Sequence, residues 1–231
     1  MLKKKKLNLE YQVRMELGID DIRENLLKFT RKAYVLLPKR KNPKILDIGC
    51  GTGVETMELY NLSKGNIVAI DIDEQALAIL KSKTEEIGLG GNIEVKKMSL
   101  LEMDFPIESF DIIWAEGVLQ FIGFENAIQD WKDILKHGGN LVLHDDDKDV
   151  PMKLNIAEQN GYKVLNYFYL PEDEWWDEYY SILDKHLLEA RQKFSADHKY
   201  WDELKKHQDV VNAVKHNVED FRSVFILLEK K

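Results

Sequence analysis

A short apolar strand that runs into three closely spaced glycines constrains the fold of this chain more than any other feature of its sequence. Residues 45–53 read ILDIGCGTG, and a second apolar run, residues 67–71, ends on Asp71. Glycines at alternate positions can adopt φ > 0 and let a ligand approach the backbone closely. A helix expected to begin near Val54 would direct its N-terminal amides at the same turn. The pattern predicts the first strand, turn and helix of a doubly wound α/β fold.

The spacing of these glycines argues against a dinucleotide site. Such sites use G-x-G-x-x-G, whereas this turn reads G-x-G-x-G, and Val54 stands at the place of the last glycine. Asp47, two residues before the turn, would disfavour a pyrophosphate and favour a cationic ligand. Asp71 follows the glycines by about twenty residues, where doubly wound folds bind ribose hydroxyls. A buried strand with a tight turn and no ligand is the alternative.

Apolar runs alternate with helical periodicity along most of the chain. The expected strands are 45–48, 67–71, 92–97, 110–115, 140–144, 162–170 and 222–228. The expected helices include one with apolar positions from Ile22 to Leu37, ended by Pro38, one that begins after Asp73 and stops at Gly88, and one with apolar positions from Ala127 to Leu135, closed by Gly138 and Gly139. This rhythm predicts a parallel, doubly wound sheet.

The segment 171–220 differs from the rest because it is acidic, aromatic and helical in its periodicity. A structureless loop of this length is improbable in a compact domain, so we expect two or three helices that form a lid. At helical spacing Trp176 shares a face with Tyr180, and Trp175 shares one with Tyr179. One pair is expected to be buried against the sheet domain and the other to line an acceptor pocket, where aromatic faces suit a cationic or amine group. Packing of the lid alone is the alternative explanation of the same residues.

Composition limits the partners and the compartment. A formal net charge of −8 argues against nucleic acid or an anionic membrane as the main partner. Lys3–Lys6 are expected to form a solvated tail rather than part of a signal peptide, and no apolar run approaches the roughly eighteen residues that would span a bilayer. The one cysteine, Cys50, excludes an internal disulfide framework and fits a reducing cytoplasm. Homodimer formation stays open.

The stretch 45–53, taken with Asp71, resembles the first motif of the class I S-adenosylmethionine-dependent methyltransferases. The resemblance covers about Ile19 to Asp147 by motif and the final strands by pattern. Residues 113–139 further resemble a small-molecule branch similar to the ubiquinone/menaquinone methyltransferases. The resemblance to class I methyltransferases implies a Rossmann-like, mostly parallel sheet of seven strands, whose last strand runs antiparallel beside the sixth. The implied organisation is a tail at 1–18, a cofactor-binding core at 19–170, a helical lid at 171–220 and the last core strand at 221–231.

The resemblance also implies a role for each residue of the motif. The turn would wrap the methionine part of S-adenosylmethionine, Asp47 would hold its ammonium group, and Asp71 would bind the ribose hydroxyls. Ile72 would lie against the adenine, beside Ser99 and Leu100, although many relatives carry Asp in place of Ser99. The implied cofactor-binding residues are Asp47, Gly49, Cys50, Gly51, Gly53, Asp71, Ile72, Ser99, Leu100 and Glu116. Cys50 itself is expected to pack as a small side chain rather than to react.

Methyl transfer from a sulfonium depends mainly on alignment, worth about 7–11 kcal/mol when the geometry is good. A base matters only for an acceptor that is protonated at the working pH, and the candidates are Glu116, His144 and Asp145, after the fourth and fifth strands. Alternatively, Glu116 caps the helix that follows it, and the run His144–Asp147 forms a solvated turn. We expect a site without a metal. In a minority hypothesis, by resemblance to catechol-type methyltransferases, Glu116, Asp145 and Asp146 would together bind Mg²⁺ or Ca²⁺.

The function expected from the sequence is methyl transfer to a small organic acceptor. The segment Ala115–Gly117 lacks the Asn/Asp-Pro-Pro-aromatic motif that is typical of transfer to a nucleobase amine, and Cys50 is in the wrong place for transfer to a pyrimidine carbon. The alternatives are a protein or RNA methyltransferase, a non-catalytic protein that binds S-adenosylmethionine, and a nicotinamide oxidoreductase, which Val54 and Asp47 disfavour.

Overall fold

The chain folds as two compact units. The computed structural model describes residues 7–194 and 198–231, so the tail expected at Lys3–Lys6 lies outside the described residues. The first unit, here called the helical unit, combines the chain up to Leu26 with Pro171–Arg222. The second, here called the sheet unit, combines Leu27–Leu170 with Ser223–Lys231. Each unit is described by itself below.

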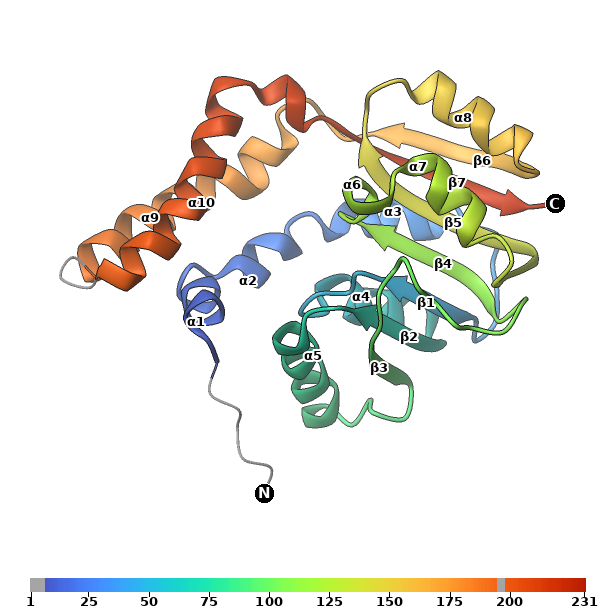
Figure 1. The fold of residues 1–231 in the computed structure, drawn as a ribbon, viewed down its shortest axis with the longest axis horizontal. Helices are drawn as coiled ribbons and strands as arrows, with labels where there is room; N and C mark the ends of the chain where they lie inside the picture. The colour runs from blue at the N-terminus through green and yellow to red at the C-terminus, as the bar shows by residue number, and fades with distance from the viewer. Residues whose placement is uncertain (1–6, 195–197) are drawn as a thin grey trace. The chain divides into compact units, whose positions relative to one another are not determined.

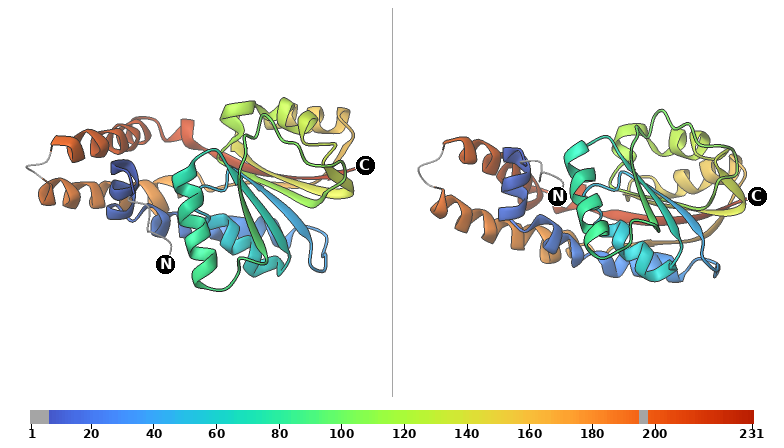
Figure 2. Two further views of the ribbon diagram at one scale, coloured as in Figure 1. Left: turned by 60° about the horizontal axis from the view of Figure 1, so that its bottom comes forward. Right: turned by 90° about the horizontal axis from the view of Figure 1, so that it is seen from below.

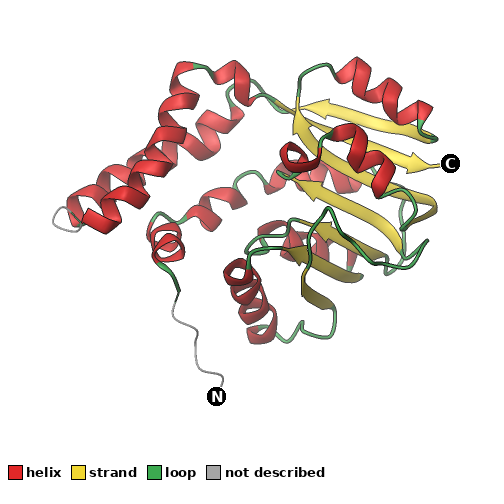
Figure 3. Cartoon of the chain, viewed as in Figure 1, coloured by secondary structure: helices red, strands yellow, loops and turns green. Residues whose placement is uncertain are grey.

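The sheet unit contains a seven-stranded sheet (Figures 1 and 3). Its strands are β1 (Lys44–Ile48), β2 (Asn66–Asp71), β3 (Ile93–Lys97), β4 (Phe110–Glu116), β5 (Leu135–Asp146), β6 (Tyr162–Tyr169) and β7 (Ser223–Lys230). Their order across the sheet is β3-β2-β1-β4-β5-β7-β6. Only β7 runs antiparallel to its neighbours, β5 and β6. The predicted mostly parallel, doubly wound sheet with an antiparallel last strand is confirmed.

Helices cover both faces of this sheet (Figure 2). One layer holds α3 (Leu27–Val35), α4 (Val54–Ser63) and α5 (Glu74–Glu86), and the other holds α6 (Leu119–Ile122), α7 (Phe124–Asp130) and α8 (Val150–Gln159). The side chain of Asp73 accepts from the amides of Gln75 and Ala76, which confirms it as the N-cap of α5. Because both faces are covered, the inner strands β1, β2 and β4 are buried along most of their length, whereas the edge strands β3 and β6 are partly exposed.

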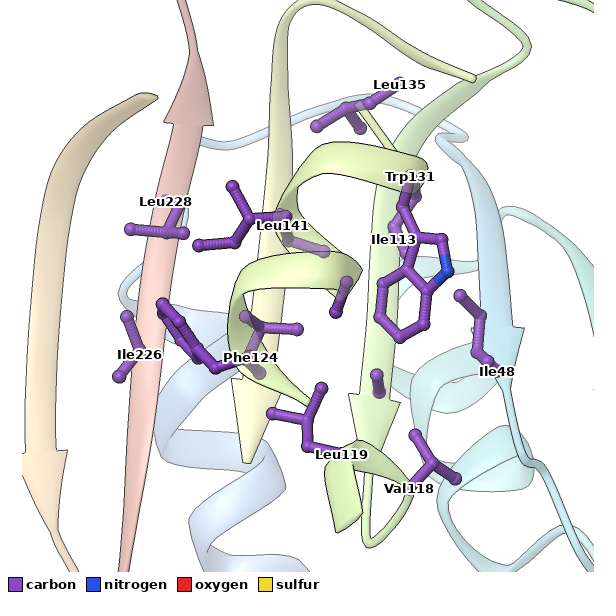
Figure 4. Packing of buried hydrophobic residues seen from close by; sticks show 14 of the residues in the cluster. Ile48, Ile113, Val118, Leu119, Phe124, Trp131, Leu135, Leu141, Ile226 and Leu228 are labelled. Atoms are coloured by element: carbon purple, nitrogen blue, oxygen red, sulfur yellow. The ribbon is translucent and has the colours of Figure 1, made fainter. Parts of the chain in front are cut away.

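The larger core lies between the sheet and the layer that contains α7. Ile113 and Leu141 project from β4 and β5 toward α7, and Trp131 closes the space from the end of that helix (Figure 4). The Trp131 side chain is fully buried, and its indole N–H donates to the carbonyl of Leu100 at 3.4 Å. These packed side chains fix the ends of β4 and β5, where the candidate site residues lie.

Two expected helices differ from the observed ones. The helix predicted from Ile22 to Leu37 is divided into α2 (Ile19–Glu24) and α3, because its continuous apolar stripe serves two cores: Ile22 packs in the helical unit, whereas the residues from Leu27 onward belong to the sheet unit. The helix predicted to reach Leu135 ends at Asp130, since Leu135 already pairs with Phe110 as the first residue of β5. Spacing alone does not separate a helix from a turn that enters a strand.

The helical unit is built from α1 (Leu9–Glu16), α2, a π-helical turn labelled η1 (Trp176–Tyr180), α9 (Ser181–Lys193), α10 (His198–His216) and a 3₁₀ turn labelled η2 (Val218–Phe221). Its core includes Val13, Leu17, Leu187 and Leu204. The helical content predicted for 171–220 is confirmed. The predicted boundaries differ from the observed division, because α1 and α2 join this unit rather than forming a tail and the start of the sheet core.

No helix in the described residues combines the length and the apolar character needed to cross a membrane.

Candidate functional site

The turn between β1 and α4 is shaped by its three glycines. Gly49, Gly51 and Gly53 have φ angles of 73°, 51° and 88°, a region that L side chains rarely adopt. The amides of Gly49 and Cys50 both donate to the carbonyl of Ile70, at 2.8 and 3.0 Å. The turn after β1 is therefore held against the end of β2, as the sequence pattern requires.

The three glycines are needed for different reasons. A Cβ at Gly49 would lie 2.1 Å from Val118 Cγ1, and one at Gly53 would lie 2.2 Å from Leu80 Cδ1. A Cβ at Gly51 would meet no atom within 4 Å. The outer glycines thus allow close packing within the protein, whereas the middle one leaves open space above the backbone, where a ligand could approach.

Asp71 ends β2 beside this turn. Its Oδ2 accepts from the amide of Gly51 at 2.8 Å, and its Oδ1 accepts from the amide of Asp73 at 2.9 Å. Each carboxylate oxygen has further lone pairs, so the group can accept additional hydrogen bonds. A pair of vicinal hydroxyls is a suitable donor set for such a carboxylate.

Asp47 lies inside β1, with 3% of its surface exposed. Its carboxyl accepts a 2.5 Å hydrogen bond from the hydroxyl of Thr56 on α4. Burial raises the pKa of Asp47 to about 8, against the opposing effect of the Thr56 hydrogen bond. The carboxylates of Glu55, Glu116 and Asp71 raise this pKa further, so the surroundings of the turn favour positive charge.

Cys50 is buried at 4% exposure, and burial raises the pKa of its thiol. The nearby carboxylates of Asp47 and Asp71 act in the same direction. A thiol kept protonated in this way is a poor nucleophile. Cys50 therefore contributes its backbone to the turn and packs as a small side chain.

The residues expected beside an adenine lie around the ends of β2 and β3. The amide of Met98 donates to the carbonyl of Asp71 at 3.0 Å, which brings the start of the loop after β3 next to β2. Ile72 is 67% exposed and could offer an apolar surface to a planar ring. The hydroxyl of Ser99 accepts a hydrogen bond from the amide of Leu101 at 3.1 Å, and Leu100 is half-buried beside it.

Glu116 ends β4, next to β1 in the sheet. Its Oε1 accepts from the hydroxyl of Thr30 on α3 and from the indole N–H of Trp114, both at 2.8 Å. Because Thr30 and Trp114 are buried, the Glu116 side chain is held from the protein side. Val118, two residues further along, packs below Gly49. Glu116 thus lies beside the glycine turn.

His144 lies beside Glu116, on the neighbouring strand β5. The two residues are register partners in the parallel pair β4 and β5, so their side chains share one face of the sheet. The imidazole stacks on the ring of Phe225, with centroids 4.5 Å apart, and Phe225 stacks in turn on Phe168 at 5.2 Å. The structure brings Glu116 and His144 together over an aromatic layer.

Asp145 lies on the opposite face of β5 from His144, as strand alternation requires. Its carboxylate forms an ion pair with Lys153 of α8 at 2.7 Å, and Asp146 forms another with the same ammonium at 2.8 Å. Burial alone would raise the pKa of Asp146, but the hydrogen bonds from Lys153 and the amide of Lys148 lower it overall. Asp145 is not brought together with Glu116 and His144.

The same contacts bear on the minority hypothesis of a metal site. Lys153 lies between Asp145 and Asp146, whereas Glu116 contacts α3 on the other side of the sheet. Within residues 7–194 and 198–231 no group of three His, Cys, Asp or Glu side chains is arranged to hold a metal ion. The structure therefore gives no support to a shared metal at these three carboxylates.

The four candidate aromatic residues of the helical unit lie in and next to η1. The predicted pairing of Trp176 with Tyr180 is replaced by ring contacts of Trp175 with both Tyr179 and Tyr180, at 5.9 and 6.1 Å. The π-helical turn causes this change, because its i to i+5 spacing brings residue 180 over residue 175. Trp176 instead receives the ammonium of Lys215 over its ring at 5.6 Å.

Three residues of these arrangements were not anticipated from the sequence. Thr56 holds Asp47, Thr30 holds Glu116, and Lys153 neutralises the two carboxylates after β5. Thr56 is the buried polar residue in the first turn of α4, where a hydroxyl facing β1 could be suspected. Thr30 contacts Glu116 across 86 residues of sequence, for which a single sequence carries no signal. Lys153 is near Asp145 and Asp146 in the sequence, but its contact with them depends on how the chain turns from β5 into α8.

Comparisons with known proteins agree with this geometry. Residues 45–139 match the family model described as a methyltransferase domain. This segment spans the glycine turn, Asp71 and Glu116. Over these residues the chain is similar to a methyltransferase domain.

Two curated relatives are 30% identical to this chain over the residues that align. A "Ubiquinone/menaquinone biosynthesis C-methyltransferase UbiE" from Cronobacter sakazakii aligns over 135 residues, 57% of this chain and 52% of the relative. A "Phosphatidylethanolamine N-methyltransferase" from Cereibacter sphaeroides aligns over 101 residues, 43% of this chain and 49% of the relative. The chain spans about half the length of the curated relatives it matches.

Solved structures of methyltransferases share the fold. The crystal structure of an S-adenosylmethionine-dependent methyltransferase from Geobacter sulfurreducens, in complex with S-adenosylhomocysteine, superposes with a TM-score of 0.72 at 14% identity. The match covers 87% of this chain and 90% of that chain. At this identity the likeness establishes the fold, a Rossmann-like methyltransferase sheet, and nothing finer.

Proposed function

We propose that the sheet unit binds S-adenosylmethionine at the glycine turn and transfers its methyl group to a small organic acceptor. The observation that carries the proposal is the contact between Asp71 and the amide of Gly51 at 2.8 Å. It holds a carboxylate suited to ribose hydroxyls beside the glycine whose Cβ position is open. The methyltransferase family of residues 45–139 supports the same function.

The charge around the turn supports this cofactor over a nicotinamide dinucleotide. Asp47 lies two residues before the turn, and burial among the carboxylates of Glu55, Glu116 and Asp71 raises its pKa. A pyrophosphate would add negative charge at this place, whereas an ammonium and a sulfonium would relieve the repulsion. Asp47 would bind the ammonium group, and Ile72, Ser99 and Leu100 would surround the adenine.

Bound S-adenosylmethionine supplies an electrophilic methyl group on its sulfonium, and this chain's own residues would align the acceptor with it. Glu116 is the residue proposed to contact the acceptor, because Thr30 and Trp114 fix its carboxylate at the end of β4. It would orient an acceptor or take its proton. His144, beside it on β5, would form the neighbouring wall of the acceptor site, and Asp145 would act structurally through Lys153.

The aromatic residues of the π-helical segment are also proposed to contact the acceptor. Turns of this kind occur frequently at functional sites, and here η1 gathers Trp175, Tyr179 and Tyr180 into one aromatic group. The proposal that the helical unit forms a lid over the acceptor rests on this group. The Arg23 guanidinium already lies over the ring of Trp175 at 5.3 Å, so the aromatic faces of this segment accept a cation.

The acceptor is proposed to be a small molecule, because the relatives named above are by name a C-methyltransferase of ubiquinone/menaquinone biosynthesis and a phosphatidylethanolamine N-methyltransferase. Their printed names differ in the atom that is methylated, so the shared domain does not fix that atom. The proposed compartment is the cytoplasm, which the single, buried cysteine supports.

The test is turnover of methyl-labelled S-adenosylmethionine by the full chain with panels of quinols, amines and carboxylic acids. Formation of S-adenosylhomocysteine that depends on one acceptor class, and that falls on Glu116→Gln, is the expected result. The panel is preceded by a thermal-shift screen with S-adenosylhomocysteine, since a ligand that binds the native state raises its stability by mass action. Binding of the product without turnover of any acceptor would favour a non-catalytic protein.

A further inference from the structure

A strongly basic segment interrupts this acidic chain between the helical unit and β1. Residues 25–46 contain seven of the 33 Lys and Arg residues of the protein and none of its 41 Asp and Glu residues. The overall net charge of −8 therefore conceals a local surface of the opposite sign. The segment comprises α3, the loop that follows it and the start of β1.

The helix α3 presents two different faces. Phe29, Thr30 and Ala33 are buried against the sheet unit. Lys28 and Lys32 are exposed, as is Val35, which keeps 76% of its surface accessible, and Leu36 follows at 39%. Two exposed aliphatic side chains at the end of a helix lined with lysines form an amphipathic surface. We call this surface the α3 patch; its residues are Lys28, Lys32, Val35, Leu36, Lys39 and Lys41.

The basic groups of the segment differ in how they are used. Arg31 pairs with Glu58 of α4 at 2.6 Å, and Arg40 donates to the carbonyl of Gly138 and, at 3.3 Å, to the side chain of Asn140. These two arginines serve the fold. Within the described residues neither Lys39 nor Lys41 forms an ion pair with a carboxylate, and both are exposed. The charges of Lys39 and Lys41 are thus available to an external partner, and those of Lys28 and Lys32 lie on the exposed side of α3 next to them.

We propose that the α3 patch docks the protein on an anionic lipid surface. Clustered lysines are attracted to acidic headgroups, and each is worth about fivefold in the partition constant near such a surface. Val35 and Leu36 would enter the headgroup layer and regain the hydrophobic free energy that their exposure forgoes. Nucleic acid would use the lysines equally well, but it offers no apolar phase for these two side chains, which is why a lipid surface fits better.

The position of the patch connects it with the proposed acceptor site. Thr30, on the buried side of α3, donates to Glu116 at 2.8 Å, and Lys32, on the outer side, lies 4.0 Å from the centroid of the Phe168 ring. Phe168 stacks on Phe225, which stacks on His144. A lipid surface at α3 would therefore lie one helix away from the end of the sheet where the acceptor is expected. The docking itself does not depend on the proposed methyl transfer.

The experiment is co-sedimentation of the full chain with vesicles of phosphatidylcholine alone or mixed with phosphatidylglycerol, at low and at high salt. We expect binding only to the mixed vesicles, and its loss at about 1 M salt, where the Debye length falls to about 3 Å. The triple variant Lys28→Gln/Lys39→Gln/Lys41→Gln should bind on the order of a hundredfold more weakly, and Val35→Ser should bind several-fold more weakly at unchanged charge.

Matched controls make the result specific to the patch. Lys81→Gln/Lys185→Gln/Lys205→Gln removes the same charge from exposed lysines elsewhere and should retain most of the binding. Replacing Lys3, Lys4, Lys5 and Lys6 with Gln removes the other basic cluster of the sequence. In this background the α3 variants should still weaken vesicle binding. The proposal would be overturned if the patch and control variants lost vesicle binding equally, or if binding were lost only when Lys3–Lys6 are replaced. Salt-sensitive binding to an RNA duplex without vesicle binding would also overturn it. Thermal unfolding confirms that each variant is folded.

Discussion

The carboxylate of Asp71 accepts a hydrogen bond from the backbone amide of Gly51 at 2.8 Å, and this contact joins the end of β2 to the middle of the glycine turn. The amide of Asp73 holds the other carboxylate oxygen at 2.9 Å. The side chain is therefore oriented by the backbone before any ligand arrives. A group oriented in advance loses little conformational freedom on binding, which favours affinity.

The three glycines of the turn should respond differently to alanine. Gly49→Ala and Gly53→Ala place a Cβ within 2.1 and 2.2 Å of Val118 and Leu80, and each should lower the free energy of unfolding by about 2–4 kcal/mol. The Cβ of Gly51→Ala meets no neighbour. This variant should lower the free energy of unfolding by only about 1–2 kcal/mol, from its left-handed backbone alone, while still weakening cofactor binding. Urea unfolding measures these losses. Equal destabilisation by all three would contradict the separate roles.

Binding of S-adenosylmethionine should release a proton from Asp47. Burial raises the pKa of this carboxyl to about 8, so it is largely protonated near neutral pH. An ammonium group beside it stabilises the ionised form and lowers the pKa, so affinity should increase as the pH rises toward about 8 and then level off. Calorimetry in buffers of different ionisation enthalpy measures the protons released. Asp47→Asn should abolish the release, and a wild-type protein that binds with no proton release would refute the assignment.

Glu116→Gln should lower kcat with little effect on cofactor affinity. If the carboxylate takes a proton from the acceptor, the loss is on the order of a hundredfold or more. Thr30→Val removes one of the two hydrogen bonds that orient Glu116 and should reduce kcat less. The pH profile of kcat separates the two variants, because only Glu116→Gln removes the titrating group. A variant at Glu116 with the wild-type rate would leave this residue as a structural contact.

Asp145 should matter for stability rather than for turnover. Its carboxylate and that of Asp146 share the ammonium of Lys153, a side chain that is 10% exposed. Lys153→Met leaves two neighbouring carboxylates uncompensated and should cost about 3–5 kcal/mol of unfolding free energy. Asp145→Asn should destabilise less and leave kcat unchanged. Loss of turnover in a fully stable Asp145→Asn protein would return this residue to the acceptor site.

Local patterns predicted the parts of the fold that depend on neighbouring residues. The strand, the glycine turn and the capped helix after Asp73 follow from spacing that any chain of this kind must satisfy, and the structure confirms them. The helix expected to reach Leu135 was wrong, because Trp131 and Leu135 carry helical spacing but serve a turn and the start of β5. Apolar periodicity reports burial and does not reveal which core receives each side chain.

The candidate site shows the same limit. Asp47 and the glycines could be named from one short motif of contiguous residues, and Asp71 from its place at the end of the next apolar run. Deciding which of His144 and Asp145 lies beside Glu116 required the register of β4 and β5, which pairs Glu116 with His144 and leaves Asp145 against Lys153. The expected neighbours Trp175 and Tyr179 are in ring contact, but the contact of Tyr180 with Trp175 depends on a π-helical turn, whose spacing the sequence did not indicate.

The most direct test of the account is calorimetric titration of the full chain with S-adenosylhomocysteine, in parallel with NAD, for the wild type and Asp71→Asn. The account predicts that wild type binds S-adenosylhomocysteine at one site and does not bind NAD. It also predicts that Asp71→Asn loses tenfold or more in affinity, about 1.4 kcal/mol, because an amide turned toward Gly51 or the ribose presents donors where acceptors are needed. No binding of S-adenosylhomocysteine to the wild type, or unchanged affinity in the folded variant, would contradict it.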